Sequence, residues 1–449
     1  MSSRKCPHLE GIIGPMERAL FLAKKLIPKK VFSGLQPAYH YALAFLGALL
    51  YRFPSRSINV IAVTGTKGKS SVVELVSALL EEAGYKTAHA STIRFKIGET
   101  TERNLHKMTM PGRFFLQSFL RKAVKAGCTH VVIEMTSEGA RQFRHKFVEL
   151  NALIFTNLAP EHIESHGSYE NYVAAKVSIA RALEASKKQN KLLVVNGDDR
   201  EAPRFLEVFG GARISFSRHD VRDAKITSDG VAFDWNGVRI QSTLPGEFSL
   251  YNILAAVTYA KAVGIPKEKA AFGIRKLAGI PGRAEKVEAG QSFDVIVDYA
   301  HTPDSLEKLY QTYAGQYRRC VLGNTGGGRD SWKRPVMASV AEKYCDEVIL
   351  TNEDPYDEDP EKIVQEMAAG MKQKTPALIL DRRAAIRESL HRSSIGDVVL
   401  ITGKGTDPYI MGPRGRKEPW DDAAVAREEL GKLIADPPAP TNPYANTRR

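Results

Sequence analysis

The chain has 449 residues, of which 43% are hydrophobic and 26% are charged, and its formal net charge is +13. This length predicts two or three domains, and the composition is globular, which excludes a largely disordered chain. Part of the positive excess lies near the two ends, so the charge alone does not indicate a nucleic-acid partner. A basic cleft for an anionic small substrate explains it equally well.

The cysteines and the first residues bear on the compartment. Cys6, Cys128, Cys320 and Cys345 show neither a Cys-x-x-Cys pair nor metal-ligand spacing, so we interpret them as buried or incidental thiols in a reducing compartment. The first ten residues lack the apolar run of a secretory signal. We therefore expect a cytoplasmic protein.

Residues 1–57 are expected to form a helical N-terminal segment. Pro28 and Pro37 should separate two helices, and Pro54 should end the second one. The most apolar stretch, 41–51, is shorter than the roughly 20 residues that a spanning helix needs. A packed helix is favoured. Contact with a membrane surface is the less favoured alternative, which the lysines before this stretch leave open.

From Ile58 onward, strands and helices alternate, which is typical of a mainly parallel, doubly wound α/β sheet. The expected strands are Asn59–Val63, Lys86–Ser91, His130–Met135, Ala152–Thr156 and Leu192–Asn196, and the expected helices are Ser70–Glu82, Arg113–Ala126, Tyr169–Ser186 and Asn252–Val263. Between 213 and 243 the apolar period shortens to two, which predicts a small antiparallel meander. Residues 58–280 should thus form a central α/β domain, and the Gly-Lys-Ser loop after its first strand, 68–70, predicts that it is the ATP-binding domain.

A second alternating series follows a linker at 279–282. Its expected strands are Val295–Val297, Cys320–Leu322, Val348–Leu350, Ala377–Leu380 and Val398–Thr402. We expect residues 281–436 to form a Rossmann-like C-terminal α/β domain, and the Pro-rich end, 437–449, to be a disordered tail.

The region after Val60–Val63 has the pattern of a phosphate-binding loop. It consists of Gly65, Thr66, Lys67, Gly68, Lys69, Ser70 and Ser71. Glycines let backbone N–H groups face an anion, the lysine supplies a charge for phosphate, and the serine supplies a hydroxyl for Mg²⁺. The common P-loop pattern wants a glycine where this chain has Val63, so this is a variant. A bland glycine turn with an exposed lysine is the less favoured interpretation.

Polar residues also stand at the ends of other predicted strands. Glu134 ends an apolar run, and ligands of open parallel sheets collect at such carboxyl ends. His162 lies just beyond the next strand; it is either a metal ligand or an ordinary loop histidine, and the spacing leaves both open. In the second series, residues 298–304 and the glycine-rich 323–330 follow strands in the same way.

In this order, these motifs resemble those of the Mur ligases, in particular the type that adds the third amino acid to UDP-N-acetylmuramoyl-dipeptide. The resemblance covers roughly residues 58–434. It rests on Gly-Thr-Lys-Gly-Lys-Ser at 65–70, Glu134-Met135-Thr136-Ser137, Thr156-Asn157-Leu158 with Glu161-His162, Ala174-Ala175-Lys176, Asn196-Gly197-Asp198-Asp199, Gly282-Arg283 and Asp298-Tyr299-Ala300-His301-Thr302-Pro303-Asp304. It implies an ATP-dependent amide ligase that activates a carboxylate as an acyl phosphate.

The resemblance also implies roles for single residues. Lys69 would hold the γ-phosphate of ATP, Ser70 and Glu134 a first Mg²⁺, and His162 a second Mg²⁺. Lys176 matches a lysine that becomes a carbamate in this family. Asn252, Arg283 and Asp298 match positions that grip adenine and ribose. The matches to segments that hold the muramoyl-peptide are Thr109, Pro111, Thr136, Ser137, Gln142 and Arg144.

Two departures from the family pattern affect specificity. The segment before Ile58 is shorter than the family's UDP-binding domain. Where members that add diaminopimelate have Asp-Asn-Pro-Arg, this chain has Glu353-Asp354-Pro355-Tyr356, and where they have Gly-Lys-Gly-His-Glu it has residues 403–407, which end in Thr406 and Asp407. The missing arginine removes a bidentate partner for a side-chain carboxylate. The candidate contacts of the amino acid are His301, Asp354, Tyr356, Thr406 and Asp407.

The acidic residues around Tyr356 favour lysine, or another diamine without a distal carboxylate, as the incoming residue. Their alternative role is to face solvent before a helix that begins near Pro360, where negative charge is favourable. Two further functions compete: a ligase of the folylpolyglutamate-synthase kind, and a non-catalytic nucleotide-binding module. We expect small-molecule partners and no nucleic acid.

Overall fold

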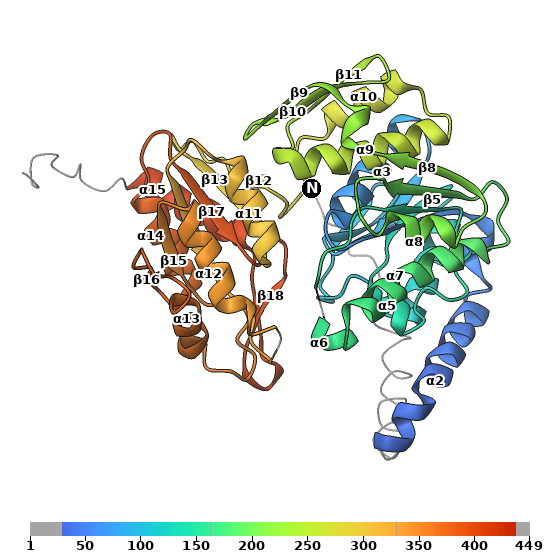
Figure 1. Ribbon diagram of the computed structural model, residues 1–449, viewed down its shortest axis with the longest axis horizontal. Coiled ribbons are helices and arrows are strands. Elements are labelled where there is room, and N and C mark those ends of the chain that lie inside the picture. The colour runs from blue at the N-terminus through green and yellow to red at the C-terminus, as the bar shows by residue number, and fades with distance from the viewer. Residues whose placement is uncertain (1–28, 162, 329, 437–449) are drawn as a thin grey trace, which may run out of the picture. The chain divides into compact units, whose positions relative to one another are not determined.

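The computed structural model describes residues 29–161, 163–328 and 330–436. The chain divides into two compact units, one of Met1–Phe216 with Thr258–Ile265 and one of Ser217–Val257 with Pro266–Arg449. Each unit is a layered α/β structure (Figure 1). The predicted tail, 437–449, and the first of the two predicted N-terminal helices lie outside the described residues.

The first unit is built on an eight-stranded sheet with the order β4-β3-β2-β5-β1-β6-β7-β8. Its strands are β1 (Asn59–Thr64), β2 (Thr87–Ala90), β3 (Arg94–Ile97), β4 (Thr100–Arg103), β5 (His130–Glu134), β6 (Ala152–Phe155), β7 (Leu192–Asn196) and β8 (Ala212–Phe216). All neighbours from β2 to β8 pair in parallel, whereas β3 and β4 form an antiparallel edge. The predicted parallel α/β class is confirmed.

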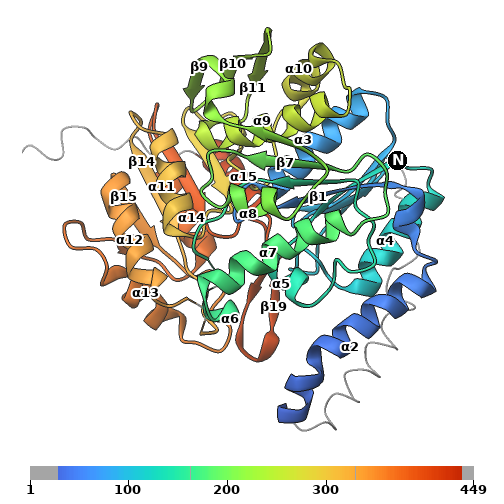
Figure 2. The same cartoon turned by 45° about the vertical axis from the view of Figure 1, so that its right-hand side comes forward.

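Helices cover both faces of this sheet. They are α3 (Lys69–Glu82), α4 (Arg113–Lys125), α5 (Ser137–Arg141), α6 (Ile163–His166), α7 (Tyr169–Glu184) and α8 (Ala202–Glu207). Figures 1 and 2 both show α3 and α7 on opposite faces. The middle strands are buried on both sides, as their continuous apolar runs predict. Their carboxyl ends therefore meet at one edge, where the polar residues of the motifs stand.

Helix α2 (Lys29–Leu50) differs from the expectation, because it begins at Lys29 and runs through Pro37, whereas the second predicted helix was expected to follow Pro37. A proline removes one backbone donor, and this loss is tolerated here since the part after Pro37 is held by burial of Leu43, Ala44 and Ala48. Its opposite side stays exposed and apolar, with Tyr41, Phe45, Leu46, Leu49 and Leu50. Within the described residues, no helix combines the length and apolarity needed to cross a membrane.

The second unit contains a six-stranded sheet with the order β12-β13-β17-β14-β15-β16. Its strands are β12 (Glu285–Lys286), β13 (Asp294–Asp298), β14 (Arg318–Leu322), β15 (Glu347–Leu350), β16 (Ala377–Leu378) and β17 (Val398–Thr402), and its helices are α11 (Pro303–Thr312), α12 (Lys333–Tyr344), α13 (Pro360–Ala368), α14 (Arg382–His391) and α15 (Asp422–Ala435). All pairs except β12 with β13 are parallel. Separate apolar clusters fill the two faces.

The same unit carries the predicted meander, β9 (Arg222–Thr227), β10 (Gly230–Trp235) and β11 (Val238–Ser242). Helix α10 (Lys267–Lys276) contacts β11. Helix α9 (Gly246–Ala262) precedes α10, and a short pair, β18 (Tyr409–Met411) and β19 (Lys417–Pro419), follows β17. The expected meander began at Arg213, but residues 212–216 form β8, which pairs with β7 over its whole length. Alternation alone does not say which sheet a strand joins.

The interpretation of the cysteines as thiols is wrong for two of them. Cys320 and Cys345 form a disulfide with Cα atoms 6.1 Å apart, and both are buried. Cys320 lies in β14 and Cys345 just before the neighbouring β15, so strand pairing brings them together although 25 positions separate them. Cys128 is a buried thiol, and Cys6 lies outside the described residues.

Candidate active site

The loop between β1 and α3 has a backbone that requires its glycines. Gly65 has φ +152°, and a Cβ atom there would lie 1.9 Å from Thr156 Oγ1. Gly68 has φ +82° and is the N-cap of α3, so no side chain caps the helix. The first backbone N–H groups of α3 are thus left available to an anion, and the helix dipole favours negative charge at this point.

The segment after β6 holds this loop in place. Asn157 accepts hydrogen bonds from the backbone of Thr66 through its carbonyl, at 2.8 Å, and from the backbone of Lys67 through Oδ1, at 2.9 Å. Thr156 Oγ1 donates to the Lys67 carbonyl at 2.7 Å, and Thr66 Oγ1 lies 2.8 Å from the Tyr172 hydroxyl on α7. The loop is therefore preorganised before any nucleotide binds.

The basic side chains of the loop lie close to its own backbone. Lys69 Nζ donates to the carbonyls of Gly65 and Thr66 at 3.1 and 2.9 Å, and Lys67 Nζ pairs with Glu161 at 3.1 Å. Ser70 is buried in the first turn of α3. A phosphate at the helix N-terminus would thus meet the Lys69 ammonium and the Ser70 hydroxyl together.

Glu134 stands beside this loop because β5 pairs with β1, which places Val63 opposite Glu134. The side chain is completely buried. Its Oε2 accepts hydrogen bonds from Thr92 N at 3.1 Å and Thr92 Oγ1 at 2.7 Å, whereas Oε1 has no partner among the described residues. A buried carboxylate oxygen without a donor is costly, so a cation fits this position.

The residues present therefore fit the Mg²⁺ that ATP chemistry implies. Over the described part of the chain, no group of three or more His, Cys, Asp or Glu side chains is arranged as a metal cage. Mg²⁺ usually binds through one or two protein oxygens together with phosphate and water, which matches Glu134 and the Ser70 hydroxyl.

Lys176 comes to the same loop from α7. Its Nζ donates to the Gly65 carbonyl at 2.7 Å, and the side chain is 2% exposed. Burial, reinforced by the nearby charge of Lys69, lowers the pKa of Lys176 well below its ordinary value, although Glu161 and Glu134 oppose this. This burial favours the neutral amine, which is the nucleophilic form of a lysine.

The residues predicted to bind the acceptor precede and follow Glu134 in the sequence. Several of them form hydrogen bonds with other residues of the chain. Thr136 accepts from Gly139 N and caps α5, and the Ser137 hydroxyl lies 3.1 Å from His166 Nε2. Burial, with Arg141 nearby, lowers the pKa of His166. Arg144 donates to the Met110 carbonyl and, at 2.7 Å, to Gln142 Oε1. Pro111 and Thr109 belong to the same connection between β4 and α4. His162 lies outside the described residues.

In the second unit, Arg283 and Asp298 are neighbours of one aromatic residue. Asp298 is buried at the end of β13 and accepts from the backbones of Ala284 and Ala300, each at 2.6 Å. Burial raises the pKa of Asp298, while Arg283 and these N–H groups oppose the rise. The Arg283 guanidinium lies 4.6 Å from the centre of the Tyr299 ring, and the His301 ring lies 4.7 Å from it. Asn252, the third predicted nucleotide contact, is buried on α9.

Glu353, Asp354 and Lys404 form a buried charged group at the carboxyl ends of β15 and β17. Lys404 Nζ lies 2.9 Å from Asp354 and 3.4 Å from Asp407. Thr325 donates to Glu353 Oε1 at 2.9 Å, while Glu353 Oε2 has no partner among the described residues. Burial raises the pKa of Glu353, which Lys404 partly offsets. Thr406 lies against Gly282 of the linker at 279–282, since a Cβ at Gly282 would stand 2.6 Å from the Thr406 backbone nitrogen.

The acidic residues around Tyr356 form more contacts within the chain than their sequence pattern implies. Glu358 pairs with the buried Arg334 at 2.8 Å, and Asp359 caps α13 by accepting from Glu361 N. Tyr356 adopts φ +53° and packs beside Gly327. Asp359 thus lies exposed at the N-terminus of α13, as the alternative interpretation of these residues has it, and it also caps the helix.

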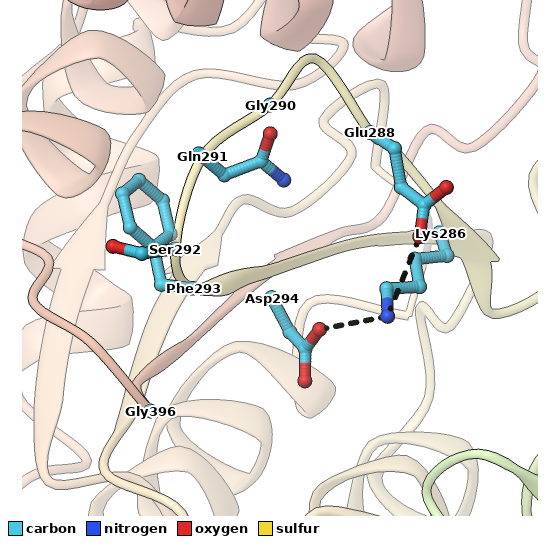
Figure 3. A pocket seen from close by; sticks show the side chains of 8 residues that line it. All are labelled: Lys286, Glu288, Gly290, Gln291, Ser292, Phe293, Asp294 and Gly396. Atoms are coloured by element: carbon cyan, nitrogen blue, oxygen red, sulfur yellow. Dashed lines mark ion pairs between the residues drawn. The ribbon is translucent and has the colours of Figure 1, made fainter.

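A separate hollow of about 430 Å³ lies near the amino end of β13 (Figure 3). Asp298 stands at the other end of this strand. It is lined by Lys286, Glu288, Gly290, Gln291, Ser292, Phe293, Asp294 and Gly396. Lys286 pairs there with Asp294 at 3.0 Å and with Glu288 at 3.5 Å. Since none of the sequence-predicted residues lines it and ligands of parallel sheets collect at the other end, it is not the active site.

The structure adds two residues to this site. Thr92 bonds Glu134, and Tyr172 bonds Thr66. Neither lies in a motif. A short Ser-Thr turn after a predicted strand was the available signal for Thr92, and helical spacing of four residues from Lys176 was the signal for Tyr172.

Two family models match the chain. The Mur ligase middle domain matches residues 63–260, and the Mur ligase glutamate ligase domain matches residues 282–405. A relative from Syntrophomonas wolfei, UDP-N-acetylmuramoyl-L-alanyl-D-glutamate--2,6-diaminopimelate ligase, is 37% identical over 415 residues, which cover 88% of this chain and 83% of the relative. The chain belongs to the Mur ligase family. As a Mur ligase, it is an ATP-dependent, ADP-forming ligase of peptidoglycan precursors.

A further relative and a solved structure are similar to this Mur ligase. The UDP-N-acetylmuramyl-tripeptide synthetase of Roseiflexus sp. is 37% identical over 424 residues, again covering 88% of this chain and 83% of the relative. The solved structure of Mycobacterium tuberculosis folylpolyglutamate synthase, in complex with ADP and AMPPCP, superposes with a TM-score of 0.66. It covers 86% of this chain and 94% of that one at 16% identity, which demonstrates a shared fold.

Proposed function

We propose that this Mur ligase joins a free amino acid to a UDP-N-acetylmuramoyl-dipeptide in the cytoplasm, using ATP and Mg²⁺. The observation that carries the proposal is the unpartnered, buried Oε1 of Glu134 beside a preorganised phosphate loop. The tripeptide synthetase and diaminopimelate ligase named above support the choice of acceptor, because both resemble this chain over most of its length.

The chemistry follows from the residues at the loop. The N-terminus of α3 and Lys69 would bind the β- and γ-phosphates of ATP, and Ser70 with Glu134 would hold Mg²⁺, which screens the clustered negative charge. The acceptor carboxylate oxygen attacks the γ-phosphorus, ADP leaves, and an acyl phosphate forms. The amine of the incoming amino acid then attacks the carbonyl carbon and releases phosphate, losing a proton as the amide forms.

Lys176 would take part as a carbamate. Burial lowers the pKa of Lys176 and so favours the neutral amine, which can add to CO₂ with loss of one proton to give an anion. An anion at this buried position would support a second Mg²⁺ together with His162. Arg283 and Asp298 are proposed to bind the adenosine moiety, since an arginine over an aromatic ring and a buried carboxylate suit a base and a ribose.

Phosphate release distinguishes the proposed function from that of a folylpolyglutamate-synthase-like ligase. This alternative is tested because the two proteins share a fold. The protein is supplied with ATP, Mg²⁺ and single amino acids, with either UDP-N-acetylmuramoyl-dipeptide or a folate as acceptor. We expect amino-acid-dependent phosphate release with the muramoyl acceptor alone. Release with the folate alone would replace this function by the alternative.

A further inference from the structure

Thr92 links two parts of the proposed site that lie far apart in sequence. It stands in the turn between β2 and β3, 42 positions from Glu134, and gives both its backbone N–H and its hydroxyl to Glu134 Oε2, at 3.1 and 2.7 Å. On its other side, its Oγ1 lies 2.7 Å from Thr109 Oγ1.

The direction of these bonds follows from the number of protons. A threonine hydroxyl has one proton, and the proton of Thr92 is donated to Glu134. Thr109 must therefore donate to Thr92, so the order is Thr109 to Thr92 to Glu134. Such chains polarise one another and strengthen the bond at the charged end.

The turn that carries Thr92 is itself firmly held. Ser91 Oγ accepts from the backbones of Ile93 and Arg94, at 3.1 and 3.2 Å. The buried Asn104 donates from Nδ2 to the carbonyls of Ser91, at 2.9 Å, and Met108, at 3.1 Å, and so joins this turn to the segment that leads to Thr109. Arg94 forms a bidentate pair with Glu74 on α3.

The effect on Glu134 is directional. Two donors hold one carboxylate oxygen, and the other, Oε1, is buried without a partner among the described residues. Fixing Oε2 fixes the rotation of the carboxylate and so determines where Oε1 points. Removal of a hydrogen-bond partner of a metal ligand typically lowers metal affinity by about 10- to 100-fold.

We propose that Thr92 is a positioning residue that orients Glu134 toward the metal and is itself oriented by Thr109. This inference rests on the proposed function, because it takes Glu134 as a ligand of the metal that accompanies ATP. It adds that Thr109, one of the residues matched to muramoyl-peptide binding, acts on the metal carboxylate through Thr92.

Metal affinity, rather than turnover, tests this inference. Mn²⁺ binding to the full chain with a non-hydrolysable ATP analogue is followed by electron paramagnetic resonance in wild type, Thr92→Val, Thr92→Ser, Thr109→Val and the double valine variant. Thr101→Val, on the exposed strand β4, is the matched control. Melting temperatures show whether each variant is folded.

We expect Thr92→Val to weaken Mn²⁺ binding about tenfold and Thr92→Ser to stay within about twofold of wild type. Thr109→Val should cause a smaller loss. The double variant should match Thr92→Val, because Thr109 acts only through Thr92. Unchanged affinity in Thr92→Val, or additive losses in the double variant, would overturn the inference.

Glu134→Gln separates this inference from the proposed function. If Glu134→Gln binds Mn²⁺ as wild type does, the metal role of Glu134 is wrong, and both proposals fail. If Glu134→Gln loses affinity while Thr92→Val keeps it, the proposed function stands and the role of Thr92 is refuted.

Discussion

Two lysines meet the Gly65 carbonyl, and burial gives them different chemistry. Lys69 leaves the first turn of α3 and bonds carbonyls of its own loop, whereas Lys176 reaches the same carbonyl from α7 and is almost completely buried. The charged form of Lys176 is disfavoured by burial and by Lys69. We therefore propose that Lys69 binds phosphate and that Lys176 forms the carbamate.

Lys69→Ala should lower the rate of amino-acid-dependent phosphate release by about 10²- to 10³-fold, because the ammonium stabilises charge that develops during phosphoryl transfer. Thermal denaturation should change little. Lys125→Ala, an exposed lysine on α4, is the control and should retain wild-type release. If Lys69→Ala released phosphate at the wild-type rate, the assignment of Lys69 would be wrong.

Lys176→Ala should be inactive, since it removes the anion proposed to support the second metal. A small carboxylic acid such as acetate should restore part of the activity by occupying the vacated space. Native mass spectrometry under CO₂ should show a carbamate-sized mass increase in wild type that is missing in Lys176→Ala. Equal mass increases in both proteins would contradict the assignment.

Among the helices of the second unit, α14 and α15 are joined by a fully buried ion pair as well as by apolar packing and the pairs of Arg383. Arg382 and Asp422 are both fully buried, 2.7 Å apart, and Arg382 also donates to the Thr402 carbonyl. Trp420 Nε1 donates to Asp422 at 2.8 Å. Each partner satisfies the other, so removing one leaves an uncompensated charge in the core.

Arg382→Ala should therefore destabilise the second unit by about 3–5 kcal/mol. Arg382→Met combined with Asp422→Leu should cost less, because neither charge is left alone. Urea unfolding, monitored by circular dichroism, gives the two values. A double variant as unstable as Arg382→Ala, or a loss below about 1 kcal/mol in the single variant, would contradict this account of the joint.

Some helices and strands follow from local sequence patterns, whereas other features depend on contacts between distant residues. Apolar period and strand-end residues predicted β1, α3, β5, β7 and β17 well, because those patterns are local. The pairing of β8 with the large sheet, the continuation of α2 through Pro37 and the Cys320–Cys345 bond depend on tertiary contacts. Thr92 escaped for the same reason, since its partner Glu134 is distant in sequence. The charged group around Lys404 likewise became visible only when β15 and β17 were placed in one sheet.

For the whole molecule, the main question of specificity is which amino acid the protein adds. Tyr356 stands where the motif resemblance to the diaminopimelate-adding type implies an arginine, and the nearby Arg334 is paired with Glu358 and Glu366. Glu353 keeps one oxygen without a partner among the described residues. A cationic side chain suits these surroundings better than a distal carboxylate does.

We expect lysine to exceed diaminopimelate by about tenfold in kcat/KM with the same acceptor, equivalent to roughly 1.4 kcal/mol. Tyr356→Arg should narrow this ratio by supplying a carboxylate partner. Competition between lysine, ornithine and diaminopimelate measures it. A preference for diaminopimelate in wild type would place the determinant elsewhere, with Thr406 and Asp407 as the next candidates.

Activation of a carboxylate as an acyl phosphate transfers a carboxylate oxygen to phosphate, so isotope labelling detects this step. The acceptor, UDP-N-acetylmuramoyl-dipeptide, is labelled with ¹⁸O in its carboxylates and turned over with ATP and the preferred amino acid, and the released phosphate is analysed by mass spectrometry. We expect one ¹⁸O atom in each phosphate if an acyl phosphate forms, because the carboxylate oxygen that attacks ATP leaves with the phosphoryl group. Phosphate without the label, released at the rate of amide formation, would contradict it.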